Sequence, residues 1–198
     1  MPVLVYTESD QGKFKKAALE VASYGKAVAE AMGTSLTALT FKVSDASELG
    51  NYGVDKVLNI NSTNTFNAKI YADAIKQAAE KENATVVILS ASADSRYLAP
   101  LVSVGLSAAY VPNVVATPSN LSPFTVKRTA FTNKAFCNTE LSTAIKIIGV
   151  SNNSFGLIEN KAAAHIEEFS PSLATSSTSV TSTDKASDKV TIADAEVV

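Results

Sequence analysis

The sequence has 198 residues, of which 46% are hydrophobic and 18% are charged. This length suits one domain with a core of its own, because a chain of this size removes about 70% of its unfolded surface from water on folding. Seventeen basic and nineteen acidic residues give a formal charge of −2, which argues against a nucleic-acid partner. A single cysteine, Cys137, excludes an internal disulfide, and a single histidine, His165, leaves no His/Cys cluster for a metal.

The amino terminus, MPVLVY, lacks the basic region of a secretory signal. No apolar run approaches the ~18 residues that a membrane-spanning helix needs. We therefore expect a soluble, cytoplasmic protein with no direct membrane insertion.

The amino-terminal half alternates between strand and helix patterns. Residues 3–6 form a short apolar run typical of a strand buried on both faces, and a helix that Gly33 closes is predicted after the turn at 10–12. The apolar positions with helical spacing are Phe14, Ala18, Val21, Gly25, Val28 and Met32. Small residues on that face (Ala22, Gly25, Ala29) would let the helix approach the sheet closely.

The alternation continues through residue 106. Strands are predicted at 36–41, 54–60 and 86–89, and a helix at 66–82, capped from 61–64 and ended by Asn83. A further helix is expected from about Leu98, with 94–97 as a separate turn, because Pro100 would break an interior helical bond. This order predicts parallel strands with right-handed crossovers.

From Tyr110 onward the pattern changes to successive strands. Strand-like segments occupy residues 111–116, 125–131, 135–137 and 143–150, and the turn at 132–134 predicts a hairpin. The fold class is therefore α/β, a Rossmann-like three-layer sandwich with a mostly parallel sheet and added antiparallel strands.

The carboxyl-terminal part has a different composition. Eleven of the twenty residues at 170–189 are Ser or Thr, which predicts a flexible linker. Residues 190–198 turn apolar again. We expect one domain over residues 1–169, the linker over 170–189, and the start of a further domain at 190–198.

Ligand loops are expected where strands 3–6 and 86–89 end. The loop at 7–13 lacks a glycine-rich phosphate motif, and no Walker sequence occurs, so neither a dinucleotide-binding site nor a P-loop is predicted. The loop at 90–96 carries Ser90, Ser92 and Ser95, which would suit a phosphate or an adenosine, or else the capping of a helix start. Asp94 places a negative charge where a phosphate would lie.

No catalytic or metal-binding residue is predicted. His165 is expected to be exposed and Cys137 to be a buried, inert thiol, so no nucleophile has a base. Residues 80–82 and 167–168 are interpreted as solvated surface. The basic pair at 127–128 lies on a predicted strand and is a weak signal for an anion or a partner subunit.

Three segments, in chain order, resemble the electron transfer flavoprotein alpha subunit over residues 1–169. They are VLVYTE with GKFKKAALE (3–8 and 12–20), LSASADSRYLAP with GLSAA (89–100 and 105–109), and RTAFTNKA (128–135). The sequence departs from the family at the hairpin, where Asn133 and Lys134 replace Gly and Asn. It also departs at Leu101, which replaces Arg, and at 151–152, where Ser-Asn replaces Arg-Pro before Asn153-Ser154-Phe155.

The resemblance implies an adenine nucleotide alpha hydrolase-like amino-terminal domain that packs against a beta subunit. In the family, FAD binds to a second domain of the alpha subunit, and AMP binds to beta. The assembly carries electrons from acyl-CoA or other dehydrogenases to a quinone oxidoreductase. None of the flavin motifs occurs in this sequence, and residues 190–198 look like the approach to the missing FAD-binding domain. The resemblance therefore implies a scaffold and interface module, with no cofactor-binding residue in this sequence.

Two other functional classes are open to test. A free-standing adenine-nucleotide-binding module of the universal-stress-protein type would place residues 90–95 around phosphate and Glu8 near the ribose. The sequence does not tell whether a vestigial nucleotide pocket at Glu8, Ser90, Ser92 and Ser95 binds anything. An ATP pyrophosphatase would need an SGGxDS-like loop after the first strand, and residues 7–10 (TESD) do not supply it.

Overall fold

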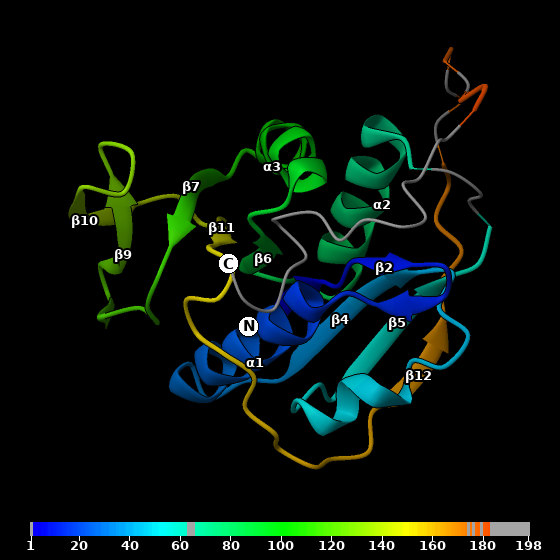
Figure 1. The fold of residues 1–198 in the computed structure, drawn as a ribbon, viewed down its shortest axis with the longest axis horizontal. Coiled ribbons are helices and arrows are strands. Elements are labelled where there is room, and N and C mark those ends of the chain that lie inside the picture. The colour runs from blue at the N-terminus through cyan, green and yellow to red at the C-terminus, as the bar shows by residue number, and fades with distance from the viewer. Residues whose placement is uncertain (1, 63–65, 174, 176, 179, 183–198) are drawn as a thin grey trace, which may run out of the picture.

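The computed structural model describes residues 2–62, 66–173, 175, 177–178 and 180–182. In this part of the chain a ten-stranded mixed sheet has the order β10-β9-β7-β11-β6-β1-β4-β5-β12, with β8 paired to β9 (Figure 1). Its strands are β1 (Val3–Tyr6), β4 (Leu36–Phe41), β5 (Lys56–Ile60), β6 (Val86–Ser90), β7 (Ala109–Val114), β8 (Asn120–Leu121), β9 (Phe124–Ala130), β10 (Ala135–Leu141), β11 (Lys146–Val150) and β12 (His165–Glu168). A separate small hairpin joins β2 (Ser9–Asp10) to β3 (Lys13–Phe14).

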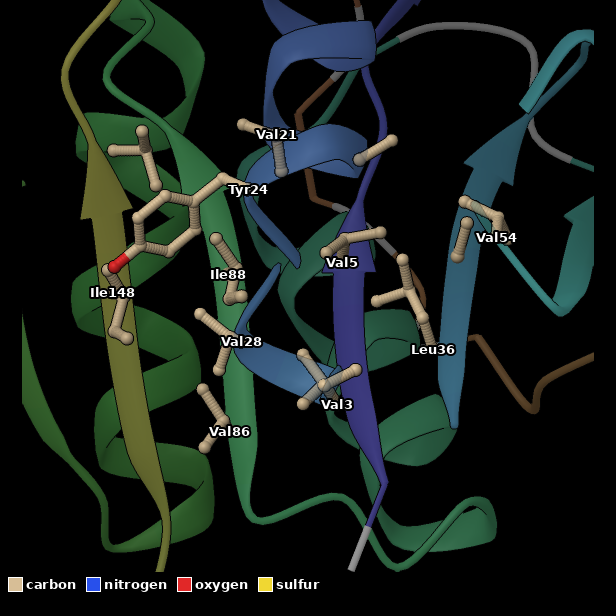
Figure 2. Close-up of a cluster of buried hydrophobic side chains, with 14 of the residues drawn as sticks. Val3, Val5, Val21, Tyr24, Val28, Leu36, Val54, Val86, Ile88 and Ile148 are labelled. Atoms are coloured by element: carbon tan, nitrogen blue, oxygen red, sulfur yellow. The ribbon is translucent and has the colours of Figure 1, made fainter. Parts of the chain in front are cut away.

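The helices form the outer two layers of the sandwich. They are α1 (Lys16–Ala31), α2 (Ala68–Lys81), α3 (Ala93–Leu106) and the short 3-10 helix η1 (Ser47–Asn51). Because successive strand residues face opposite sides, Val3 and Val5 pack in the cluster that includes α1, and Leu4 packs in the one that includes α2 and α3. Figure 2 shows the α1 cluster. The three-layer α/β sandwich is confirmed.

Gly25 lets α1 lie close to the sheet. A Cβ at this position would lie 2.5 Å from Val5 Cγ1 and 3.0 Å from Leu36 Cδ1. Ala22 and Ala29 on the same helix are also buried, which confirms the prediction of a close helix approach. At the end of α1, Gly33 has a φ of +63°, a left-handed conformation that glycine adopts without strain.

The strand pattern is parallel on one side of the sheet and antiparallel on the other. All neighbours from β7 to β12 in the sheet order pair in parallel. Strands β9 and β10 then add to β7 in antiparallel fashion, which confirms the predicted hairpin.

Two predicted helix starts were wrong. Phe14 lies in β3 and α1 begins at Lys16, because the chain first turns back in the β2–β3 hairpin. The cap of α2 is Asn67, whose side chain accepts from the amides of Lys69 and Ile70, and not a residue of 61–64. Of that segment, residues 63–64 lie outside the described residues. Asn83 follows the end of α2 with a φ of +51°.

Helix α3 is continuous from Ala93, so the separate turn predicted at 94–97 was wrong. The Ser92 hydroxyl caps its first turn by accepting from the Ser95 amide at 3.0 Å, and the Arg96 amide bonds to the Ser92 carbonyl at 3.2 Å. Pro100 lies inside this helix, which runs from Ala93 to Leu106 without a break.

The edge strand β12 was not predicted. Its sequence, HIEE, has no apolar alternation, and its place follows from main-chain pairing with β5. Beyond it, the Gln77 side chain of α2 exchanges two hydrogen bonds with the main chain of Ser172. Residues 183–198, which include the end of the predicted linker and the start of the further domain, lie outside the described residues.

Candidate functional site

The carboxyl ends of β1 and β6 meet at a cluster centred on the Glu8 carboxylate. Glu8 is only 2% exposed. Its Oε1 atom accepts from the Ser90 hydroxyl at 2.7 Å, from the Ser95 hydroxyl at 3.0 Å, and from the Ser92 hydroxyl. Its Oε2 atom lies 3.3 Å from the Lys15 ammonium. The structure therefore brings the four residues of the suspected vestigial pocket together around the Glu8 carboxylate.

Local structure explains why these groups converge. Glu8 follows the end of β1, and the β2–β3 hairpin returns the chain so that the Lys15 amide bonds to the Glu8 carbonyl at 3.1 Å. Ser90 ends the neighbouring parallel strand β6, and Ser92 and Ser95 begin α3. Parallel strands bring their carboxyl ends to one edge, which is the usual ligand position in such sheets.

The electrostatics of this cluster disfavour a second anion. Burial raises the pKa of Asp94, the nearby Glu8 carboxylate raises it further, and Lys15 partly offsets the effect. Burial, with Glu8 as the next cause, also raises the pKa of Tyr6 well above its usual value. Two carboxylates thus face one half-exposed lysine.

The cluster does not fit the phosphate of a nucleotide or the pyrophosphate of FAD. A phosphate site at this position would use the serine hydroxyls and the start of α3 as donors. All three hydroxyls already donate to Glu8. A bound phosphate would have to displace a buried carboxylate and would then lie beside Asp94.

A second buried carboxylate, Glu20 on α1, holds the segment after β11. Glu20 is 4% exposed and accepts three main-chain hydrogen bonds, from Asn153 at 2.8 Å, Phe155 at 2.8 Å and Gly156 at 3.0 Å. Sequence reasoning missed this role. The available signal was a charged residue placed between apolar positions of a buried helix, followed far along the chain by a small-residue turn.

The Glu20 contacts begin a longer attachment of residues 151–164 to the domain. Phe155 packs edge-on against Tyr24, with ring centroids 5.3 Å apart. Farther along, the Asn160 amide donates to Asn51 and the Ala162 amide donates to Gly50 in η1. Figure 1 shows this segment passing α1 and η1 to reach β12. It is a fixed connection between the two parts of the sheet.

Charged residues that were interpreted as solvated surface instead pair with one another. Lys56 on β5 lies 2.8 Å from Glu82 and 3.0 Å from Glu167, and Lys81 also pairs with Glu167. The two lysines lower the pKa of Glu167 to about 2. The edge strand β12 carries Glu167, so this network fixes it to β5 and to the end of α2.

The remaining candidates form no reactive pair. Cys137 lies half-buried on β10, and its sulfur lies 3.8 Å from the Thr139 hydroxyl. His165 is exposed on β12, at the opposite edge of the sheet. Within the described ranges, no group of three or more His, Cys, Asp or Glu side chains is placed to hold a metal. The helices described in the structure include none with the length and hydropathy to cross a membrane.

The β9–β10 hairpin leaves large apolar groups in solvent. Phe131 at its tip is 82% exposed and Phe136 on β10 is 65% exposed. The predicted basic pair lies on β9, where the Lys127 ammonium sits 4.2 Å from the centre of the Phe136 ring and the Arg128 side chain donates to Thr139.

Comparison with curated proteins finds no match. The family model of the electron transfer flavoprotein domain matches residues 3–174. This range contains the closed cluster at Glu8, the Glu20 contacts and every strand and helix from β1 to β12. The chain therefore belongs to the electron transfer flavoprotein domain family.

Proposed function

We propose that this chain supplies the amino-terminal domain of an electron transfer flavoprotein alpha subunit. In this role it is a scaffold and a contact for the beta subunit, and it is not itself an enzyme. FAD is held by another domain of the assembly and AMP by the beta subunit. The assembly carries electrons from acyl-CoA or other dehydrogenases to a quinone oxidoreductase.

The observation that carries the proposal is the occupation of the usual ligand position by Glu8. In a Rossmann-like sheet, the donors at the ends of β1 and β6 are where a nucleotide phosphate binds. Here the side chains of Ser90, Ser92 and Ser95 serve an internal carboxylate. A domain that keeps the nucleotide-binding architecture, with these serine hydroxyls already donating to an internal carboxylate, is suited to a structural role.

The assignment to alpha is supported by the three sequence segments that resemble that subunit. The first of these segments also contacts a later part of the region that resembles the subunit, because Glu20 accepts from the main chain of Asn153 and Phe155. This contact connects α1 to the chain after β11.

The alternative of a free-standing adenine-nucleotide-binding module has less support. It requires the hydroxyls of the 90–95 loop to be free for phosphate, and these donate to Glu8. It also requires a site that tolerates further negative charge, whereas Asp94 lies beside the Glu8 carboxylate.

Purification and mixing test the proposal. The purified chain should show no flavin absorbance near 450 nm. Mixed with the second electron transfer flavoprotein subunit of the same organism, it should sediment as a one-to-one complex. A chain that carries stoichiometric FAD by itself, or that stays monomeric in the mixture, would contradict the proposed function.

A further inference from the structure

Helix α3 is apolar on both of its sides. Leu98 and Val102 are buried in the core cluster between the helices and the sheet. On the opposite side, Tyr97, Leu101 and Val104 are 67%, 41% and 82% exposed. Their spacing of four and three residues places these three side chains on one stripe of the helix. A helix that is apolar all round is normally buried all round, so α3 lacks a cover among the described residues.

The exposed stripe of α3 is also uncharged. Pro100 continues it, and we call Tyr97, Pro100, Leu101 and Val104 the α3 stripe. The charged residues of α3 are Asp94 and Arg96, both at its start. The neighbouring helix α2 instead exposes three charged residues (Lys69, Glu80, Lys81), as a solvated helix face usually does.

The chain after β12 covers α2 but not the α3 stripe. The Gln77 side chain of α2 exchanges two hydrogen bonds with the main chain of Ser172. The side chain of Asn67, the cap of α2, donates to the Thr178 hydroxyl at 3.3 Å. The chain therefore runs along α2 from Gln77 to the start of that helix.

The start of α2 is close to the α3 stripe. Both helices cross between parallel strands, so both begin at the carboxyl ends of the strands. They are neighbours, since a Cβ on Gly105 of α3 would lie 3.4 Å from Lys76 Cδ of α2, and the axes of packed helices lie about 8–10 Å apart.

The length of chain after the described residues suits this distance. Residues 183–189 separate Ser182 from the apolar segment 190–198, and seven residues span at most about 25 Å. The α3 stripe rises about 10 Å from Tyr97 to Val104, so nine residues are enough to cover it.

The chemistry of residues 190–198 complements the α3 stripe. Their sequence is VTIADAEVV, in which six of nine residues are apolar and the two charged ones, Asp194 and Glu196, are both acidic. Arg96, beside the stripe, is the only basic residue of α3. Apolar residues with acidic neighbours therefore meet an apolar surface with a basic neighbour.

A segment of the same chain suits this small surface better than a separate molecule. Four side chains offer far less than the ~800 Å² per partner that a stable interface between separate proteins needs. A tethered segment needs less contact, because a short linker gives it an effective concentration on the order of millimolar.

We propose that the α3 stripe is the docking site for residues 190–198 of this chain. The stripe supplies apolar contact, and Arg96 supplies charge complementarity to Asp194 and Glu196. This inference concerns contacts within the chain and does not rest on the proposed function. Because residues 190–198 are expected to begin a further domain, such docking would fix where that domain starts relative to the sheet.

Paramagnetic relaxation in the full chain tests the docking. A nitroxide is attached to Val197→Cys in a Cys137→Ser background, so that the label has one site. The amides of residues 97–104 should relax at least about threefold faster than those of α1, which lies on the other side of the sheet, because a docked label stays next to α3.

Variants of the stripe give the matched comparison. Leu101→Ser and Val104→Ser should each reduce the enhancement at α3 about threefold or more, because they remove apolar contact. The control is Ile158→Ser, which is 52% exposed on the segment that passes α1 and should leave the enhancement unchanged. Thermal unfolding of these variants should match that of wild type, since the changed side chains are exposed.

A charge exchange tests the role of Arg96. Arg96→Glu and Glu196→Lys should each reduce the enhancement about twofold, as expected for an exposed ion pair. The double variant should recover it, because the pair is restored with its signs exchanged. Failure of the double variant to recover would overturn the pairing of Arg96 with the segment.

The remaining outcomes identify other occupants. Equal relaxation at α3 and α1, or no effect of the stripe variants, overturns the docking. Relaxation of an isotope-labelled chain by a separate nitroxide-labelled chain also overturns it, because a second copy would then cover the stripe. If α3 gains protection only when the second electron transfer flavoprotein subunit is added, the docking is overturned and the proposed function stands.

Discussion

Two regions of the domain differ in exposure. Polar groups at the carboxyl ends of the parallel strands are buried and hydrogen-bonded, whereas the antiparallel hairpin exposes apolar side chains. At the strand ends, Glu8 accepts from the hydroxyls of the 90–95 loop and Glu20 accepts from the main chain after β11, so these donors are already paired within the domain. At the hairpin, Phe131, Phe136 and the outer side of β10 face solvent. The strand ends, where related architectures bind nucleotides, are internally paired, whereas the hairpin leaves large apolar side chains in solvent.

This difference has consequences for stability. Changes at the closed strand ends should destabilise the domain, because they uncover buried donors or charges. Changes to the exposed side chains of the hairpin should leave the domain as stable as before. The predictions below run from the largest expected change in the free energy of unfolding to the smallest.

Glu20→Ala should have the largest effect. It removes the acceptor of three main-chain amides and releases the chain after β11, with an expected loss of about 3 kcal/mol. Urea unfolding measures it. Glu30→Ala, an exposed position on the same helix, is the control and should change stability by less than about 0.5 kcal/mol. Equal effects of the two variants would contradict the role given to Glu20.

Glu8→Ala should cost about 2 kcal/mol, because three serine hydroxyls lose a shared charged acceptor, although they can rotate to other partners. The matched control is Glu48→Ala on η1, which is exposed. If Glu8→Ala were as stable as wild type, the cluster would not be the internally satisfied site described above.

Gly25→Ala should destabilise by about 1–3 kcal/mol, because the added methyl would overlap Val5 and Leu36. Gly105→Ala on α3 should instead stabilise the domain. Its Cβ would lie 3.4 Å from the flexible Lys76 side chain, so the gain in helix propensity, about 0.5–1 kcal/mol, should prevail. Thermal unfolding of both variants checks the pair, and the same sign for both would show that α1 packing has been misjudged.

The Glu167 network gives a small, pH-dependent effect. Lys81 and Lys56 lower the pKa of Glu167 from 4.5 to about 2. The stabilisation from its ion pairs is therefore present above about pH 4.5 and is lost as the pH falls towards 2. Glu167→Gln should therefore differ from wild type in β12 hydrogen exchange at pH 7 and converge with it near pH 2. If the difference in exchange between Glu167→Gln and wild type grew as the pH fell, the stabilising role given to the ionised Glu167 would be contradicted.

The sequence predicted the elements whose patterns are local. Strands β1, β4 and β6 were found because each is an uninterrupted apolar run, and α2 because its apolar residues have helical spacing. The antiparallel hairpin was found from its turn. In the site, the grouping of Glu8 with Ser90, Ser92 and Ser95 followed from the rule that parallel strands end at one edge.

The sequence could not predict features that depend on distant partners. Strand β12 has no apolar alternation, and it is held by main-chain pairing with β5 and by ion pairs to Lys56 and Lys81. The role of Glu20 required knowing that residues 153–156 pass over α1. The start of α3 was misplaced because the effect of Pro100 was weighed without the Ser92 cap and the bond from Ser95 to Glu8.

Titration of the wild-type chain with AMP tests the central claim most directly, with calorimetry and amide exchange of residues 90–95 as readouts. The account predicts no heat of binding at millimolar AMP and no added protection at these amides. The reason is that the serine hydroxyls of this loop already donate to the Glu8 carboxylate. Saturable binding with protection of residues 90–95 would contradict it and would identify the strand ends as an open nucleotide site.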